Sequence, residues 1–316
     1  MSVIICGSLN TDLSFYASHF PTPGETLQAK SFTQGFGGKG ANQAIACAKC
    51  GVETHLISAL GDDIFGKAYS QHLSSFSCLK HHNNVIAGCS SGLASITIDE
   101  SGENQIILNP GANLELGDQM VDHFFDSYGN SLLKANKLIG LVQGELSLST
   151  TLHFLRECKK LNIFTVFNFA PVSVTCQVKL LPELVDLLIV NTIEASSLVE
   201  QFDLYTTVEP IKLMETLCRY FKSVVITLGK EGAIIGYGDQ TPIVSIPATT
   251  VEKVVDTTGA GDACCGSLCA ALALGFPLEQ SLKAAMRVAG DKVGKAGAQS
   301  TLTFSESSFV EFVNNC

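Results

Sequence analysis

Short apolar runs bounded by glycine or asparagine recur along the chain, and they limit its fold more than any other feature. They lie at residues 3–9, 55–60, 137–142, 164–169, 187–190 and 224–228. Stretches with the apolar periodicity of helices lie between most of them, at residues 40–49, 64–76, 150–161, 211–221, 261–274 and 278–293. Because strands that alternate with helices pair in parallel, this pattern predicts an α/β fold. We expect a doubly wound, mostly parallel central sheet with helices on both faces.

Residues 92–108 break this alternation. Two extended stretches flank a polar segment at residues 99–103, which predicts a β-hairpin outside the main sheet. A second extended piece is expected over residues 14–32, and the two segments together are predicted to form a small β-sheet lid. No Pro/Ser-rich linker and no run of like charges divides the chain, so residues 1–316 are expected to form one compact unit.

The charge balance limits the partners of the protein. A formal net charge of -10 argues against a nucleic-acid or anionic membrane surface, because both need clustered Lys and Arg. Backbone amides at a helix N-terminus still bind phosphate in an acidic protein. The first residues, MSVIICG, fit a strand better than a signal peptide, and no apolar run reaches membrane-spanning length. We therefore expect a cytoplasmic protein whose 12 cysteines are reduced.

Two motifs are better explained by local structure than by chemistry. Residues 61–67, GDDIFGK, match the spacing of a P-loop, but Ala68 replaces the Ser or Thr that would hold Mg²⁺. We interpret this segment as a strand-to-helix turn capped by Asp62. Cys47 and Cys50 form a lone CxxC pair, and no second pair completes a zinc site.

The run DTTGAGD at residues 256–262 carries the clearest chemical signal, because it follows an extended segment and opens a helix of small residues. Small residues let the backbone approach a ligand, and the free amides at the helix start form an anion hole. Asp262 then presents a carboxylate beside a bound phosphoryl group, where it can accept a proton from an attacking hydroxyl. An acidic N-cap on a Gly-rich turn explains one aspartate, but it does not explain the whole run.

Four further motifs extend this signal over nearly the whole chain: GSLNTD at residues 7–12, PGET at 23–26, GGKGANQA at 37–44 and NTIE at 191–194. In combination they resemble the ribokinase-like carbohydrate kinase family. The resemblance implies an ATP-dependent kinase that transfers the γ-phosphoryl group to the 5-hydroxyl of D-ribose. A related deoxyribose or nucleoside kinase is one alternative. A non-catalytic sugar-binding protein of the same fold is another.

The resemblance also implies roles for individual residues. The base would be Asp262, and the anion hole would be formed by Gly259, Ala260 and Gly261. The sugar would be bound by Asn10, Asp12, Gly38, Lys39, Asn42 and Glu145. Carboxamides and carboxylates suit vicinal hydroxyls because they offer several directional hydrogen bonds. Turn formation or helix capping would explain any one of these residues alone. Polar clusters at several strand ends favour a binding site.

Nucleotide and cation sites follow from the same resemblance. The positions that match the family's ATP and Mg²⁺ site are Asn191, Glu194, Thr227 and Gly229, and oxygen ligands of this kind suit a hard cation. The family further implies a K⁺ ion beside the anion hole. Its ligands would be the Asp256 side chain, the carbonyls of Thr258, Lys292, Lys295 and Gly297, and the hydroxyl of Thr301. A homodimer joined through the lids is implied as well.

Overall fold

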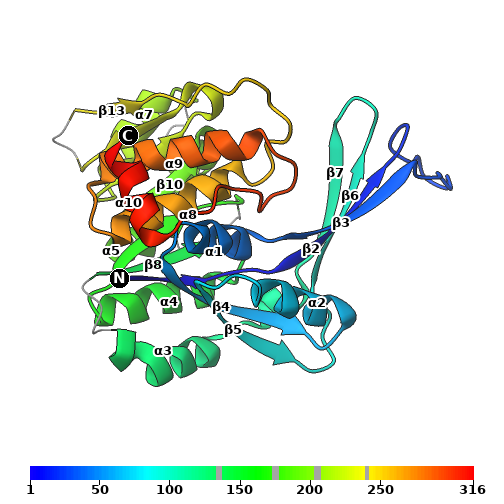
Figure 1. Cartoon of the computed structure of the whole chain (residues 1–316), viewed down its shortest axis with the longest axis horizontal. Helices are drawn as coiled ribbons and strands as arrows, with labels where there is room; N and C mark the ends of the chain where they lie inside the picture. Colours follow the sequence, from blue (N-terminus) through cyan, green and yellow to red (C-terminus); the bar gives the residue numbers. More distant parts are fainter. Residues whose placement is uncertain (133–136, 173–177, 203–207, 239–241) are drawn as a thin grey trace.

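The computed structural model of the protein describes residues 1–132, 137–172, 178–202, 208–238 and 242–316. A nine-stranded sheet forms its centre (Figure 1). In spatial order its strands are β13 (Val244–Ile246), β12 (Ala233–Gly236), β11 (Val224–Thr227), β10 (Leu187–Asn191), β9 (Phe164–Asn168), β8 (Leu138–Gln143), β1 (Ser2–Cys6), β4 (Glu53–Gly61) and β5 (Leu79–Ile86). The strands from β11 to β5 pair in parallel, whereas β12 and β13 are antiparallel. The predicted mostly parallel sheet is confirmed.

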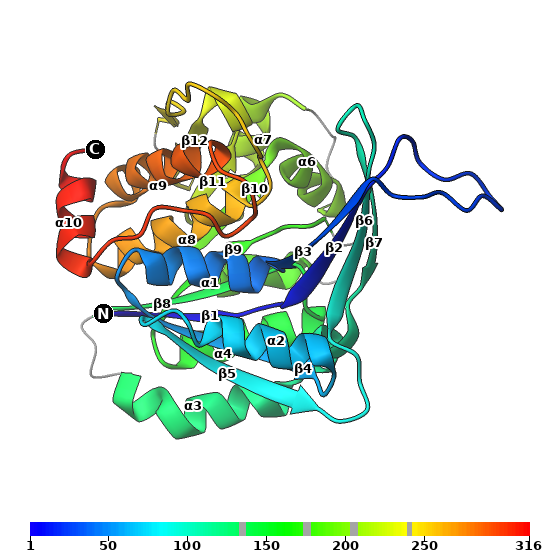
Figure 2. The same ribbon diagram turned by 45° about the vertical axis from the view of Figure 1, so that its right-hand side comes forward.

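Helices cover both faces of this sheet, as predicted (Figure 2). Side chains of one face pack against α1 (Lys39–Lys49), α2 (Ile64–Leu73), α8 (Ala260–Ala273), α9 (Leu278–Val293) and α10 (Glu306–Asn314). The opposite face packs against α3 (Asp118–Leu132), α4 (Leu148–Lys160), α5 (Leu181–Leu184), α6 (Thr192–Gln201) and α7 (Pro210–Leu217).

The central strand β1 shows why its sequence is apolar throughout. Val3 and Ile5 belong to the core under α1 and α8, while Ile4 and Cys6 belong to the core on the other face. All four side chains are fully buried. A strand with two covered faces has no polar face, so it reads as a continuous apolar run.

The order of the strands reverses between β1 and β8. From β1 the chain builds outward through β4 and β5, and from β8 it builds the other way through β9, β10 and β11. The connections that leave the carboxyl ends of β1 and β8 therefore diverge to opposite sides of the sheet. In α/β sheets this divergence forms the crevice in which ligands bind.

A separate four-stranded sheet stands beside the main body, at the right of Figure 1, in the order β3 (Ser31–Gly37), β2 (Asn10–Tyr16), β6 (Gly92–Ile98) and β7 (Asn104–Asn109). The hairpin predicted over residues 92–108 is formed by β6 and β7. The extended piece predicted over residues 14–32 is in fact two strands, β2 and β3, and residues 17–30 lie outside both. β2 begins at Asn10 and pairs in parallel with β6. Asn10 and Asp12 therefore belong to this small sheet.

The two motifs that we assigned to local structure do have structural roles. The cap of α2 is Asp63, whose Oδ1 accepts the Gly66 N–H at 2.8 Å, so the assignment to Asp62 was wrong by one residue. Cys47 and Cys50 lie in the core, and burial raises the pKa of both thiols. All 11 cysteines in the described part of the chain are free. Among the same residues, no helix combines the length and the apolar character that a membrane span requires.

Helices α1 and α8 approach each other closely at Gly266 of α8. A Cβ atom at this position would lie 2.3 Å from the Gln43 carbonyl oxygen and 2.8 Å from the Ala46 Cβ. Both neighbours belong to α1, and the carbonyl is backbone that cannot rotate away. The absence of a side chain at Gly266 therefore sets the spacing between the two helices.

Replacing Gly266 by alanine should push α8 away from α1. We expect Gly266→Ala to lower the free energy of unfolding by about 1–3 kcal/mol, the usual cost of overpacking a core. Gly117→Ala is the matched control, because its nearest neighbour would be 3.9 Å away. Urea denaturation of the three proteins measures the effect. Equal midpoints for both variants and the wild type would contradict this account of the helix spacing.

Candidate active site

Asp262 lies in the first turn of α8 and is held by two amides of α1. Its Oδ2 accepts a hydrogen bond from Asn42 Nδ2 at 3.0 Å, and its Oδ1 accepts one from Gln43 Nε2 at 2.9 Å. The residue is 6% exposed. A buried carboxylate needs such donors, and here they also fix its orientation.

The side-chain amides of Asn42 and Gln43 are in turn held by hydrogen bonds to other residues. Gln43 Nε2 also donates to Asn168 Oδ1 at 2.9 Å, and Gln43 Oε1 accepts from Gln143 Nε2 at 2.8 Å. Asn42 Oδ1 accepts from Gln299 Nε2 at 3.0 Å. The network therefore links the carboxyl ends of β8 and β9 to α1 and α8. Of these residues only Asn42 was assigned a role from the sequence, because single amides near strand ends give no signal of their own.

The turn before Asp262 has the geometry expected of an anion hole, with one change. Gly259 has φ 77°, and a Cβ there would lie 2.4 Å from the Ala298 carbonyl oxygen, so only glycine fits. A Cβ at Gly261 would meet no atom within 4 Å, which leaves its backbone open to a ligand. The Ala260 N–H already donates to the Thr257 carbonyl at 3.1 Å. The turn thus uses one of the three predicted amides for itself.

Glu145 connects the reversal point of the sheet to the start of α1. Its Oε2 accepts the Lys39 backbone N–H at 2.8 Å and the hydroxyl of Ser8, which follows β1. The Lys39 side chain interacts with the charges of Asp262, Glu145 and Glu194, and these raise the pKa of its amine, Asp262 most of all. One lysine therefore offsets part of the repulsion among three carboxylates.

Asp12 reaches the same region from the small sheet. A Cβ at Gly37 on β3 would lie 2.3 Å from Asp12 Oδ2, so the glycine leaves room for the carboxylate. Burial raises the pKa of Asp12 to about 6, and the negative charge of Glu145 adds to the rise. The protein itself therefore compensates the ionised form of Asp12 poorly.

Asn10 and Gly38 meet at the junction of the two sheets. The Asn10 Oδ1 accepts a hydrogen bond from Asn113 Nδ2 at 2.9 Å, so part of its side chain is committed to structure. Asn113 lies in the short 3-10 helix η1 (Gly111–Glu115) and also holds the Leu9 backbone. Gly38 has φ 89°, and a Cβ there would lie 2.7 Å from the Asn10 nitrogen. The six residues predicted to bind the sugar therefore come from adjoining elements.

The residues predicted to bind the nucleotide lie at the ends of β10 and β11. Asn191 and Glu194 form a reciprocal capping box at the start of α6, each accepting the other's backbone N–H at 2.8 Å. Asn191, Thr227 and Gly229 line one open pocket of about 370 Å³. Burial raises the pKa of Glu194, and the positive charge of Lys39 opposes the rise. Asn191 and Glu194 therefore cap α6, and Glu194 also interacts with the charges of Lys39 and Asp262 in the site.

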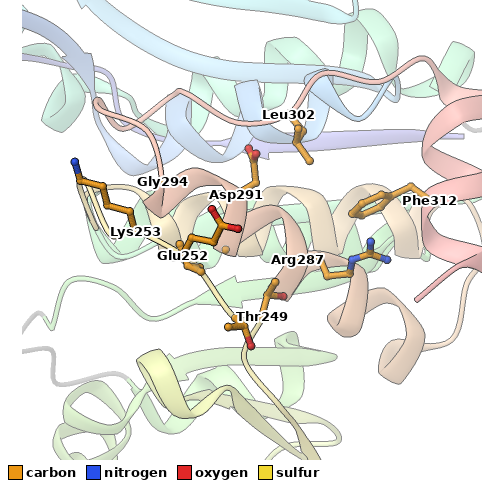
Figure 3. Close-up of a pocket in the computed structure, with 11 residues that line it drawn as sticks. Thr249, Glu252, Lys253, Arg287, Asp291, Gly294, Leu302 and Phe312 are labelled. Atoms are coloured by element: carbon orange, nitrogen blue, oxygen red, sulfur yellow. The ribbon is translucent and has the colours of Figure 1, made fainter.

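A second open pocket, of about 450 Å³, lies between the segment 249–253 and the exposed side of α9 (Figure 3). Gly290 lines it, and a Cβ there would lie 2.9 Å from the Thr249 Cβ. The Arg287 guanidinium packs on the Phe312 ring at 4.7 Å and closes one end. Gly294 lies at the other end, next to the segment that leads to Asp256. Arg287, Gly290 and Phe312 belong to no sequence motif that predicts this pocket.

The residues predicted to bind K⁺ are brought together, but a lysine side chain lies among them. Asp256 accepts the Thr258 N–H with Oδ1 at 2.8 Å and the Gly297 N–H with Oδ2 at 2.9 Å. The Lys292 ammonium donates to the Asp256 carbonyl at 2.7 Å and to the Lys295 carbonyl at 3.2 Å. The Thr301 hydroxyl is buried and has no hydrogen-bond partner within the described ranges.

Burial and the neighbouring charges shift the pKa values of Asp256 and Lys292 in opposite directions. Burial alone would raise the pKa of Asp256, but hydrogen bonds from Thr258 and Gly297 and the charge of Lys292 hold it below its usual value. Burial lowers the pKa of the Lys292 amine, and Asp256 opposes the change.

Comparison with known proteins places this geometry in a family. The model of the pfkB family carbohydrate kinases matches residues 1–304. The chain belongs to the pfkB family of carbohydrate kinases. Among curated relatives of this pfkB-family chain, the ribokinase of Mus musculus is 31% identical over 96% of the chain and 93% of the relative. The deoxyribokinase of Salmonella typhi is 30% identical over 95% of each chain.

Solved structures agree with this assignment. The ribokinase of Thermotoga maritima is 30% identical and superposes with a TM-score of 0.83 over 99% of both chains. The ribokinase of Cryptococcus neoformans, solved in complex with ADP, is 29% identical, with a TM-score of 0.82 over 98% of this chain and 99% of that one. The fold predicted from the sequence is therefore that of a known carbohydrate kinase architecture.

Asp12 gives a stability prediction for this pfkB-family protein. Its pKa rises from 3.8 to about 6 on folding, so ionising it should cost the folded state up to about 3 kcal/mol, at about 1.4 kcal/mol per pH unit. This cost is absent below pH 3.8, grows as the pH rises to about 6 and is constant above that value. Asp12→Asn should therefore be more stable than the wild type at pH 8, and the difference should shrink towards pH 5.

Urea titrations at pH 5 and pH 8 measure this difference. Asp126→Asn on the exposed side of α3 is the control, and it should follow the wild type at both pH values. A stability gain that is the same at both pH values would show that Asp12 has an ordinary pKa.

Proposed function

We propose that this protein is an ATP-dependent kinase that phosphorylates the 5-hydroxyl of D-ribose. The observation that carries the proposal is the Asp262 carboxylate at the start of α8, held by Asn42 and Gln43 and preceded by the Gly259–Gly261 turn. A carboxylate fixed beside open backbone amides suits proton removal next to a phosphoryl group. The ribokinase relatives named above support ribose as the sugar.

In the proposed reaction the 5-hydroxyl oxygen attacks the γ-phosphorus of ATP. Asp262 accepts the hydroxyl proton, the new O–P bond forms, and the bond between the γ-phosphorus and the bridging oxygen breaks to release ADP. The Gly259 and Gly261 backbone lies where negative charge develops on the phosphoryl oxygens. Lys39, whose amine interacts with the charge of Asp262, would supply positive charge beside the phosphoryl group.

ATP is proposed to bind across the ends of β10 and β11, in the pocket lined by Asn191, Thr227 and Gly229. ADP in the Cryptococcus neoformans relative supports a nucleotide cosubstrate. Glu194 fits a Mg²⁺ ion that arrives with ATP, because the capping box engages only Oε2 and the carboxylate faces the charges of Lys39 and Asp262. Such an ion would neutralise charge on the phosphate oxygens.

The remaining site residues are proposed to select the sugar. Asp12 and Asn10 would bind ring hydroxyls from the small sheet, while Gly38, Lys39, Asn42 and Glu145 would complete the pocket from the main body. A deoxyribose kinase is the second candidate, because the Salmonella typhi deoxyribokinase is about as similar to this chain as the ribokinases are. The two sugars differ at one hydroxyl, so a single side chain could separate them.

We also propose that the protein forms a homodimer through the small sheet. Strand β7 is exposed along its whole length and carries Ile106, Ile107 and Leu108, which are 55%, 77% and 46% exposed. An unpaired apolar edge of this kind is normally covered by a partner.

If Asp262 is the base, replacing its carboxylate by a carboxamide should slow the reaction. Asp262→Asn keeps the size of the side chain but removes its basicity, and it should lower kcat by roughly 10²–10⁴-fold. Ribose and ATP binding should largely survive, which isothermal titration calorimetry measures. Asp126→Asn is the control and should leave kcat unchanged. A kcat near the wild-type value in the Asp262 variant would reject the assignment.

The role of Asp12 as a sugar ligand predicts a change in selectivity. Asp12→Ala should lower kcat/KM for ribose by roughly 10–100-fold, the loss expected for a charged hydrogen bond of about 1.5–3 kcal/mol. The measurement is a kinetic series with ribose and 2-deoxyribose. A defect confined to ribose places the contact at the 2-hydroxyl, and an equal defect places it at the 3-hydroxyl. If no sugar responds, Asp12 does not bind substrate.

A further inference from the structure

Lys292 is fully buried, whereas the other lysines in the described part of the chain are exposed or half-exposed. It lies in the last turn of α9, and its side chain is 0% exposed. The ammonium donates to the carbonyls of Asp256 and Lys295 and lies 3.8 Å from Asp256 Oδ2. Burying an ammonium is costly unless it is paired and hydrogen-bonded, and here both conditions are met.

These partners include groups that the family resemblance assigns to a K⁺ ion. The Asp256 carboxylate and the Lys295 carbonyl are both in the predicted ligand set, and the Lys292 ammonium contacts or approaches both. An ion that bound the same oxygens would lie a few ångströms from a buried positive charge. Like charges at that range repel strongly where water does not screen them.

The other predicted ligands are mostly engaged in local structure. The Lys292 carbonyl accepts the Lys295 N–H at 2.9 Å, and the Gly297 carbonyl accepts the Ser300 hydroxyl at 2.7 Å. The Thr301 hydroxyl is buried without a partner in the described part of the chain, but it is a neutral oxygen that would have to hold an ion beside the Lys292 ammonium. The residues present therefore do not fit K⁺.

We propose that the Lys292 ammonium is a built-in cation that takes the place of K⁺ in this protein. It joins the segment before α8 to the segment after α9, because one carbonyl partner lies in each. Asp256 strengthens the same junction through the Thr258 and Gly297 amides. The Gly-rich turn that leads to Asp262 starts at this junction. Lys292 is thus a positioning residue for the turn, and its effect on activity rests on the proposed function.

A tethered ammonium differs from a bound ion in two physical ways. Its N–H groups are directional donors, so it holds particular carbonyls rather than any oxygens around a sphere. It is also covalently part of α9, so its occupancy does not depend on the ion concentration outside. The protein should therefore keep an ordered turn in buffers of any monovalent cation.

The wild-type protein gives the first test. We expect phosphorylation rates and thermal unfolding midpoints to agree in K⁺, Na⁺ and tetramethylammonium chloride at matched ionic strength, with rates equal within about twofold. A rate that K⁺ raises about fivefold or more over both other salts would overturn the proposal. So would a midpoint that only K⁺ raises, and this readout needs no activity.

Substitution of Lys292 gives the second test. Lys292→Ala keeps the backbone carbonyl and opens space, so in tetramethylammonium buffer it should lose about tenfold or more in kcat and several degrees in midpoint. Adding K⁺ or methylammonium should restore part of both losses. Lys292→Met fills the space without charge and should show the losses without the rescue. Lys283→Ala, an exposed lysine on the same helix, is the control and should match the wild type.

The outcomes separate the two proposals. A Lys292→Ala variant that matches the wild type in tetramethylammonium buffer would overturn the role of Lys292. If neither Lys292 variant folds, the wild-type salt series decides the question. A wild type that phosphorylates no sugar contradicts the proposed function, and the thermal midpoints then still test the built-in cation.

Discussion

The hydrogen bonds from Asn42 and Gln43 to Asp262 are the constraint on which the rest of the site depends. They join α1 to the start of α8, and they form only because Gly266 lets the two helices approach. A carboxylate in this position would otherwise be a buried charge without donors, which folding does not tolerate. Gln43 is also hydrogen-bonded to Gln143 and Asn168, so the main sheet, α1 and α8 hold the carboxylate together.

The electrostatics of the site are local rather than global. The chain has a formal net charge of -10, so no broad positive field draws a phosphate to it. Within the site, Lys39 interacts with Asp262, Glu145 and Glu194. Attraction of a phosphate must come from this lysine, from open backbone amides and from ions that accompany the nucleotide. Burial raises the pKa of Asp12 in the same region, and the negative charge of Glu145 adds to the rise.

Features that depend on neighbouring residues in the chain could be predicted from the sequence. Features that depend on contacts between residues far apart in the chain could not. The apolar runs and the DTTGAGD turn determine their local structure through their own residues, so the predictions of the parallel sheet and of the start of α8 were correct. β5 was missed because its sequence, LKHHNNVI, is largely polar although α3 half-covers it. The Gln299 contact to Asn42 joins residues that are 257 positions apart in the chain. Lys292 was expected to contribute only its carbonyl, because nothing in the sequence reveals that its side chain is buried.

The small sheet carries both a residue of the proposed sugar site and an exposed apolar edge. Asp12 lies on β2, and Ile106, Ile107 and Leu108 lie on β7, with only β6 between the two strands. If a ligand at Asp12 changes the orientation of this sheet, it changes the affinity for whatever binds β7. Thermodynamic reciprocity then requires that a molecule bound to β7 change the affinity for the ligand by the same factor. Substrate affinity would thus depend on the concentration of the partner that covers this edge.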